Sequence, residues 1–156
     1  MGLALKEPVV PVHDPGLARL WTYWNERRRG RAFPARADID PLDFAYVLGN
    51  VILADVFHDP LRFRIRLYGS NLAERMNYDM TGRDIDNHPC PEFRDRVVRD
   101  WRETVQSRQI SHRMIDEWMD DRHVRYESLR LPLSTDGRTI DMLLVAVVHL
   151  DVQIRS

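Results

Sequence analysis

The segment from Ile140 to Val148 most constrains how this chain folds, because nearly every one of its residues is apolar. Alternate residues of an extended strand point to opposite faces of a sheet. The even-numbered positions from 140 to 148 therefore share one face, and the odd-numbered positions from 143 to 147 share the other. A strand that is apolar on both sides predicts a sheet that is covered on both faces.

A helix predicted to begin at Asp14 supplies one of these covers. Asp14 is suited to cap the helix, and Pro15 suits the first helical position, where a missing N–H costs nothing. The spacing i, i+3, i+4 and i+7 defines one apolar face, made of Leu17, Leu20, Trp21 and Trp24. Burial stabilises a large apolar side chain by about 1.5–3 kcal/mol. We expect this helix to cover the far face of its own sheet, alone or jointly with a second copy of the chain.

The remaining patterns predict five strands and two further helical regions in a single domain. The strand over 62–68 alternates, which places Phe63, Ile65 and Leu67 on one face. The expected strands are 50–57, 62–68, 110–119, 123–133 and 139–150, with a short helix over 40–49, small helical turns over 69–83 and a longer helix over 91–107. The expected division is an arm over 1–13, a helical extension over 14–49, a core over 50–150 and a tail over 151–156.

Composition excludes several classes of protein. A chain of 156 residues with 44% apolar and 30% charged residues is typical of one soluble globular domain. No run approaches the about 18 apolar residues of a membrane span, and the start of the chain lacks the layout of a signal peptide. The net charge of −1 argues against nucleic acid or a membrane surface as partner. The one cysteine, Cys90, fits a reducing compartment, so we expect a cytoplasmic protein.

Several separated motifs match those of the PAS domain in their order along the chain, and the chain therefore resembles a PAS domain. Residues 63–85 are similar to the PAS segment that runs from the second strand through small helices to a Thr-Gly-Arg turn. A bacterial family of short PAS-like proteins shares three further motifs, Trp24-Asn-Glu-Arg-Arg, Pro34-Ala-Arg-Ala-Asp-Ile-Asp-Pro41 and Leu131-Pro-Leu-Ser-Thr-Asp-Gly137. The resemblance implies an α+β fold with a five-stranded antiparallel sheet and helices on one face, and the apolar pattern places the N-terminal extension over the other. It also implies a sensory or protein-interaction role.

The search for chemistry in the sequence predicts no catalytic residue and no metal site. Haem-binding PAS domains use an axial histidine, and His88 is the position to consider, although a surface role is favoured. Cys90 lies in His88-Pro-Cys-Pro-Glu92 rather than in the Asn-Cys-Arg-Phe type of motif that PAS relatives use for covalent flavin, so flavin is not expected. Asp116 and Glu117 are neighbours on a strand and point to opposite faces, so they are not a catalytic pair.

The PAS arrangement encloses an apolar cavity, for which the sequence offers candidate lining residues. These are Leu67, Met76, Tyr78, Met80, Phe93, Val97, Trp101, Met114, Trp118, Leu129, Met142 and Leu144, and a packed core remains the alternative to a ligand site. An Arg–Asp clasp formed by Arg36, Asp38 and Asp40 is expected to fix how the first helix meets the sheet.

We therefore expect a non-enzymatic sensory or regulatory module that forms a homodimer and acts through a protein partner, a small hydrophobic ligand, or both. Two alternatives stay open. One is a small α+β enzyme with a polar, cone-shaped pocket, which needs an Asp/His pair inside the cavity. The other is a purely structural dimerisation domain.

Overall fold

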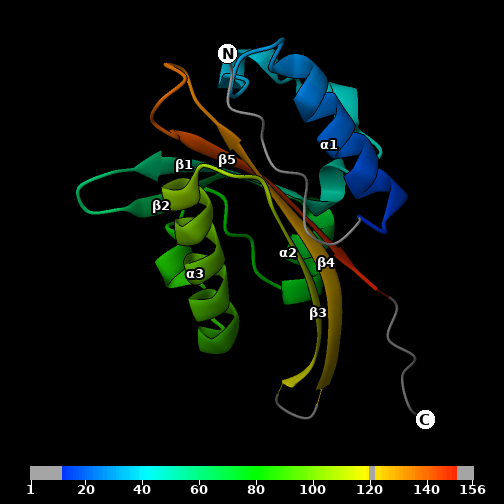
Figure 1. Ribbon diagram of the computed structural model, residues 1–156. Coiled ribbons are helices and arrows are strands. Elements are labelled where there is room, and N and C mark those ends of the chain that lie inside the picture. Colours follow the sequence, from blue (N-terminus) through cyan, green and yellow to red (C-terminus); the bar gives the residue numbers. More distant parts are fainter. Residues whose placement is uncertain (1–11, 120–121, 151–156) are drawn as a thin grey trace.

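A computed structural model describes residues 12–119 and 122–150, and its centre is a five-stranded antiparallel sheet in the order β2-β1-β5-β4-β3 (Figure 1). Residues 1–11 of the expected arm over 1–13 lie outside the described residues, as do the tail over 151–156 and residues 120–121 of the turn after β3. The strands are β1 (Val51–Phe57), β2 (Arg62–Tyr68), β3 (Ser111–Met119), β4 (Arg122–Leu133) and β5 (Met142–His149).

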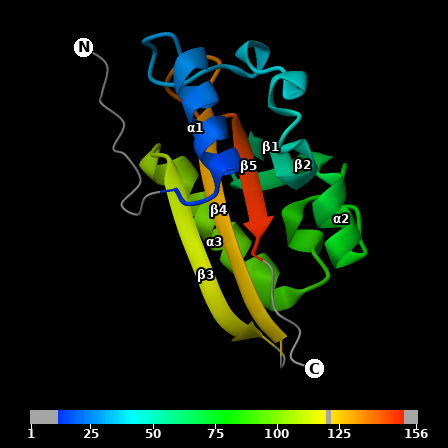
Figure 2. The same cartoon turned by 90° about the vertical axis from the view of Figure 1, so that its right-hand side faces the viewer.

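The sheet is covered on both faces, as the apolar pattern of β5 predicts. Helix α1 (Pro15–Arg27) crosses one face, and helix α3 (Pro91–Ser107) packs against the other (Figures 1 and 2). The central strand β5 lies between β1 and β4, and its first six residues are buried. The predicted α+β fold, with helices on one face and the N-terminal extension on the other, is confirmed.

Helix α1 begins and packs as its sequence predicts. The Asp14 carboxylate accepts a hydrogen bond from the N–H of Leu17 at 3.0 Å. Leu17, Leu20 and Trp24 are fully buried against the sheet, and Trp21 is half-buried. The indole N–H of Trp24 donates to the carbonyl oxygen of Pro132 on β4 at 2.9 Å. One face of α1 is thereby joined to the sheet by both packing and a buried hydrogen bond.

The segment between α1 and β1 forms three short 3-10 turns instead of the single short helix expected over 40–49. Asp40 caps the second of them by accepting from the N–H of Leu42 at 3.0 Å. The run then breaks at Val47, whose φ of −131° and ψ of 0° are neither helical nor extended. The turns are η1 (Arg36–Asp38), η2 (Pro41–Phe44) and η3 (Leu48–Asn50).

A register shift in the first hairpin corrects the expected alternation of β2. Ile65 pairs with Ala54, but Leu67 pairs with Leu53, because the register changes between Leu53 and Ala54. One extra residue on a strand reverses the faces of the residues beyond it. Phe63 and Ile65 therefore face α3, whereas Leu67 faces the α1 side.

Two further helical pieces follow β2, α2 (Ser70–Met76) and η4 (Ile85–Asn87). The turn before α2 requires glycine, because a Cβ added at Gly69 would lie 2.2 Å from the carbonyl oxygen of Gly49. Within residues 12–119 and 122–150, no helix is long and apolar enough to cross a membrane.

Candidate functional site

A small cavity between α3 and the sheet is the candidate site. Its volume is about 20 Å³. A cavity needs roughly 10–15 Å³ to hold one water molecule, so this one has room for about one water. The lining residues come from α3 and from the facing side of β1, β4 and β5: Ile52, Phe93, Val97, Asp100, Trp101, Tyr126, Ser128, Arg130, Val145 and Val147.

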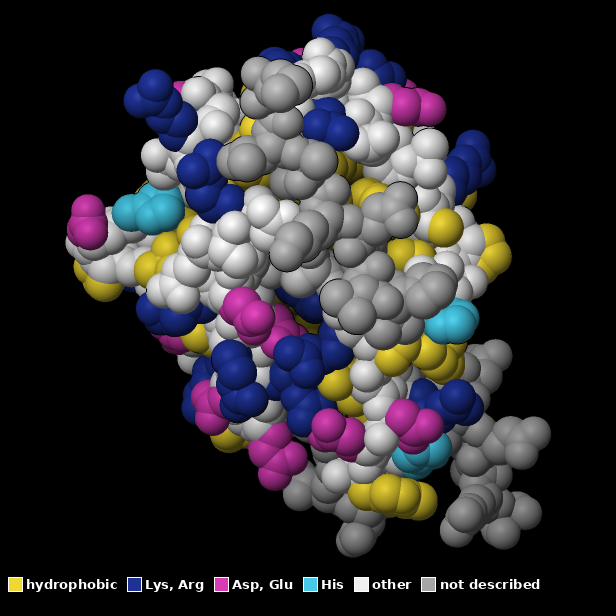
Figure 3. Space-filling model, in the orientation of Figure 1, with side chains coloured by type: hydrophobic (Ala, Val, Ile, Leu, Met, Phe, Trp, Pro, Cys, Tyr) yellow, Lys and Arg dark blue, Asp and Glu magenta, His cyan; other side chains and the backbone are white. Residues whose placement is uncertain are grey.

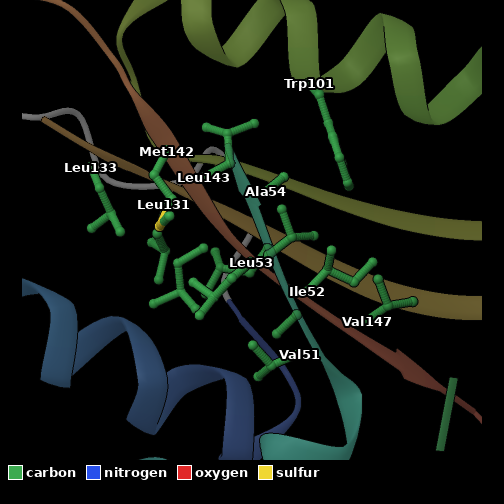
Figure 4. Close-up of a cluster of buried hydrophobic side chains, with 14 of the residues drawn as sticks. Val51, Ile52, Leu53, Ala54, Trp101, Leu131, Leu133, Met142, Leu143 and Val147 are labelled. Carbon is green, nitrogen blue, oxygen red and sulfur yellow. The ribbon is translucent and has the colours of Figure 1, made fainter. Parts of the chain in front are cut away.

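Trp101 fills much of the space between α3 and the sheet. Its side chain is 2% exposed and extends from α3 towards the strands (Figure 4). Its ring packs edge-on against Phe63 of β2, with centroids 5.5 Å apart and planes at 87°. Edge-to-face contacts of this kind stabilise a core beyond the burial of area alone. The indole therefore occupies volume that a ligand would need.

A buried ionic cluster closes the polar side of the cavity. Asp100 on α3 has a side chain that is 7% exposed, and its carboxylate accepts a hydrogen bond from Arg113 of β3 at 2.7 Å. The guanidinium of Arg130 on β4 lies 4.0 Å from the other Asp100 oxygen, and that side chain is 4% exposed. Two arginines thus share one carboxylate, which leaves the cluster with a surplus positive charge.

Two serines on neighbouring strands accept hydrogen bonds from Arg130. Its Nε donates to Ser111 at 2.5 Å, and its Nη1 donates to Ser128 at 2.7 Å. Burial lowers the pKa of Arg130 to about 10, and the Asp100 carboxylate opposes that shift. Arg130 is therefore charged at neutral pH, and its hydrogen bonds are made within the protein.

Tyr126 supplies the other polar group of the lining. Burial raises the pKa of its phenol, and the nearby guanidinium of Arg96 acts in the opposite direction. The phenol is therefore neutral at physiological pH. The ring of Phe93 packs edge-on against it, with centroids 6.3 Å apart.

The residues around the cavity do not fit a flavin or a haem. A ring system of that size needs a pocket of several hundred cubic ångströms, far more than the cavity offers.

His88, the histidine considered as a haem ligand, is buried, and its Nδ1 accepts the N–H of Cys90 at 3.1 Å. A neutral imidazole whose Nδ1 accepts carries its proton on Nε2, the atom that an axial ligand would need free. Burial also lowers the pKa of His88. Cys90 precedes the first turn of α3 and does not line the cavity.

The structure divides the predicted lining residues between the two faces of the sheet. Only Phe93, Val97 and Trp101 line the cavity. Antiparallel pairing places Leu131 and Leu144, and Leu129 and Ala146, side by side on the α1 face, as Figure 4 shows for Leu131 and its neighbours. The α1 face also holds Leu67, Leu129, Met142 and Leu144 from the predicted set.

The rest of the predicted set lies at the margins. Met114 and Trp118 on β3 are 41% and 61% exposed. Met80 is buried and Met76 and Tyr78 are half-buried, but none of the three belongs to the cavity lining. The pattern-based set therefore does not form one pocket.

The expected Arg–Asp clasp has a different cation. Asp38 pairs with Arg31, just after α1, at 2.6 Å and accepts the N–H of Ala35 at 2.8 Å. Arg36 instead donates to the carbonyl oxygen of Ile39 at 2.6 Å. These hydrogen bonds, together with the cap at Asp40, shape the connection between α1 and β1.

A second buried polar cluster, absent from the sequence predictions, lies on the α1 face. The Glu127 carboxylate of β4 accepts the N–H groups of His13 and Asp14 at 2.8 and 2.7 Å. It also accepts from His112 Nε2 of β3 at 2.6 Å, and both side chains are 1% exposed. Glu127 breaks the apolar alternation of β4, and that was the available signal. Among the described residues, no group of three or more side chains is arranged to hold a metal ion.

Comparison with known proteins identifies the family. The sequence model of a PAS domain matches residues 12–147, a range that includes α1 as well as the sheet. This chain belongs to the PAS domain family. The resemblance to the PAS domain is thereby confirmed, and membership places the chain among sensory signalling modules. The three motifs assigned to a family of short PAS-like proteins stay a prediction.

Three solved structures are similar to this chain at low sequence identity. A sensory box sensor histidine kinase from Vibrio cholerae is 20% identical over 71% of this chain and 92% of that chain, with a TM-score of 0.49. A domain of an HTR-like protein from Haloarcula marismortui is 11% identical over 65% of this chain and 99% of that chain, with a TM-score of 0.44. A fungal LOV domain photoreceptor is 14% identical over 74% of this chain and 94% of that chain, with a TM-score of 0.44. No curated protein sequence gives a significant match.

Proposed function

We propose that this PAS domain is a non-enzymatic regulatory module of the cytoplasm that acts as a homodimer and passes its signal through contacts with another protein. The observation that carries this proposal is that only about 20 Å³ of space is left between α3 and the sheet, beside the indole of Trp101 and the Asp100 cluster. This cavity has no room for an organic cofactor, so the outer surfaces of the module are left to carry the signal.

Strand β4 offers a route between the two sides of the molecule. Ser128 and Arg130 face the cavity, whereas Glu127 and the carbonyl of Pro132 hold α1. A partner that shifts β4 changes the packing on both faces, because alternate residues of one strand serve both layers. Signalling then consists of a population shift between two packings of α1 on the sheet.

The absorbance spectrum and native mass of the full chain test this proposal. The chain is expressed with excess haem precursor and riboflavin, then purified without denaturation. The expected mass is that of the polypeptide alone or of its dimer, with no haem or flavin absorbance. A stoichiometric cofactor in the purified chain would refute the proposal that the module works without a resident cofactor.

A second candidate function, binding of a small molecule, is favoured by the mixed character of the lining. Asp100, Arg130, Ser128 and Tyr126 bring polar groups to an otherwise apolar wall. A ligand there requires α3 to move away from the sheet. Thermal unfolding of the chain against a panel of metabolites measures this: a compound that raises the melting temperature in proportion to its concentration supports binding. The same wall offers a carboxylate paired with arginine and no histidine, which does not favour the enzyme alternative.

A further inference from the structure

A surplus of positive charge is buried beside the cavity between α3 and the sheet. Two arginines share the Asp100 carboxylate, Arg113 at 2.7 Å and Arg130 at 4.0 Å. The side chain of Arg130 is 4% exposed, and among the described residues Asp100 is the one carboxylate within 4.0 Å of it. A buried charge is costly unless an opposite charge lies close to it. Because Asp100 contacts Arg113 more closely, the charge of Arg130 is only partly compensated.

The polar wall of the cavity has hydrogen-bond donors for an anion. Ser111 and Ser128 accept one hydrogen bond each from Arg130, at 2.5 and 2.7 Å, and a guanidinium carries several further N–H groups. Arg130, Ser128 and Tyr126 all line the cavity. Burial raises the pKa of Tyr126, so its phenol keeps its proton at neutral pH. A hydroxyl that accepts a hydrogen bond still has its own proton to donate, so three side chains offer donors.

The other charged groups near the cavity do not remove this surplus. Arg96 pairs with Glu117 at 2.5 Å. Glu103 also attracts Arg130, but it does so from an exposed position on α3, where water and salt screen its charge. Figure 3 shows Lys or Arg and Asp or Glu side chains interspersed on the surface over α3. The charges outside are therefore mixed, and the surplus lies inside, where screening is weakest.

The size and lining of the cavity restrict the kind of anion. Its volume of about 20 Å³ is a little more than the roughly 10–15 Å³ that one water molecule needs. A halide ion is slightly larger than water, whereas phosphate or an organic acid is much larger. Most of the lining is apolar, which favours the weakly hydrated chloride and bromide over fluoride. Asp100 also lines the cavity and opposes an anion, but the two guanidinium groups outweigh its single charge.

We propose that the cavity between α3 and the sheet is a binding site for a single halide ion, chloride or bromide, held by the guanidinium of Arg130 and the hydroxyls of Tyr126 and Ser128. The bound anion supplies the second negative charge that Arg113 and Arg130 need. This inference rests on the second candidate function, binding at this cavity, and names a ligand class small enough to need no movement of α3.

Thermal unfolding of the full chain at constant ionic strength tests the site. Sodium chloride replaces sodium gluconate, whose anion is too large for the cavity. At about five times its dissociation constant, chloride is expected to raise the melting temperature by about 2–4 °C, and the rise saturates. Bromide is expected to act like chloride, and fluoride to act less. The width of the chloride NMR signal, which increases on exchange with a protein site, gives a second readout on the folded chain.

Two substitutions are expected to change the chloride affinity in opposite directions. Arg130→Met removes the charge and the main donor, so it is expected to abolish the chloride effect in both measurements. Asp100→Asn removes the opposing carboxylate, so it is expected to tighten chloride binding about 10-fold or more. The matched controls are Arg99→Met and Asp95→Asn at exposed positions of α3, which leave the affinity unchanged. A cluster with a structural role alone does not give opposite effects.

The outcomes separate this site from the function on which it rests. A wild type without a saturable chloride effect overturns the halide site, as does an effect that Arg130→Met retains or that Asp100→Asn weakens. If Arg130→Met does not fold, Tyr126→Phe takes its place, because loss of one donor is expected to weaken chloride binding several-fold. A metabolite that stabilises a chain without any chloride response overturns the halide site alone and leaves the second candidate function in place.

Discussion

Glu127 shows how much of the α1 docking depends on one side chain. A buried carboxylate is costly unless its oxygens accept hydrogen bonds. Glu127 receives them from two backbone N–H groups at the start of α1 and from His112, which must carry its proton on Nε2 to donate to a carboxylate. One side chain thus joins β3, β4 and the residues that precede α1.

Glu127→Gln is expected to lower the free energy of unfolding by about 1.5–3 kcal/mol at pH 7, the contribution of hydrogen bonds to a charged group. Burial raises the pKa of Glu127, but the hydrogen bonds from His13, His112 and Asp14 outweigh it, so the pKa lies below its ordinary value of 4.5. The carboxylate therefore stabilises the fold above pH 4.5, and this contribution fades as the pH falls through the lowered pKa. Urea unfolding at pH 7 and at pH 3–4 measures the difference between wild type and variant. A difference that stays constant with pH would contradict this assignment, and Glu74→Gln, at an exposed site, controls for the substitution.

Substitutions of Asp100 and Arg130 are expected to lower the stability of the fold by different amounts, although the two residues belong to one cluster. Asp100→Asn leaves two guanidinium groups near each other without a carboxylate, and removal of one partner from a buried ion pair costs about 3–5 kcal/mol. Arg130→Met costs less, because Asp100 keeps its 2.7 Å contact with Arg113. Chemical denaturation at pH 7 ranks the two variants. Asp95→Asn, at an exposed carboxylate of the same helix, is the control, and an equal loss for Asp100→Asn and Asp95→Asn would show that the cluster does not stabilise the fold.

At the scale of elements, α1 presents two tryptophans whose indole groups differ in environment. The N–H of Trp24 donates to Pro132, whereas the buried N–H of Trp21 has no hydrogen-bond partner within the described part of the chain. Trp24→Phe therefore leaves a buried carbonyl without its donor, which costs about 1–3 kcal/mol in addition to the lost ring area. Trp21→Phe loses ring area alone. Thermal unfolding of the two variants compares them, and a Trp21→Phe variant as unstable as Trp24→Phe would show that the hydrogen bond to β4 is not what distinguishes the two positions.

Sequence patterns predict elements that bury continuous apolar surface. They fail where polar groups or irregular backbone determine which face of the sheet a residue lies on. The two-sided burial of β5 and the cap at Asp14 follow directly from residue order. The face of Leu67 does not, because one shifted residue in the first hairpin reverses it. Asp100 shares the buried stripe of α3 with Trp101, yet its arginine partners come from β3 and β4. Such contacts between distant segments are fixed only by the packed fold.

For the molecule as a whole, the two covers of the sheet have different interiors. Trp24 and several leucines pack densely beneath α1, as Figure 4 shows for the sheet side of this layer. The α3 side combines Trp101 with a charged cluster and the cavity. Close-packed interiors resist small changes in volume, so the α3 side is where space for a ligand is created at lowest cost.

Trp101→Ala tests whether the chain fills its own ligand site. The substitution is expected to lower stability by about 3–5 kcal/mol, since it removes a 2% exposed side chain from the wall beside Phe63. The apolar void that it leaves suits a flat aromatic molecule, and engineered apolar cavities bind such molecules. Indole is therefore expected to raise the melting temperature of Trp101→Ala and to leave the wild type unchanged. Leu20→Ala, beneath α1, serves as the control, because the space it opens is too small for a bicyclic ring. If indole stabilised the wild type as strongly as Trp101→Ala, the native chain would already have an open pocket. The proposal that the chain has no room for a resident ligand beside Trp101 would then be wrong.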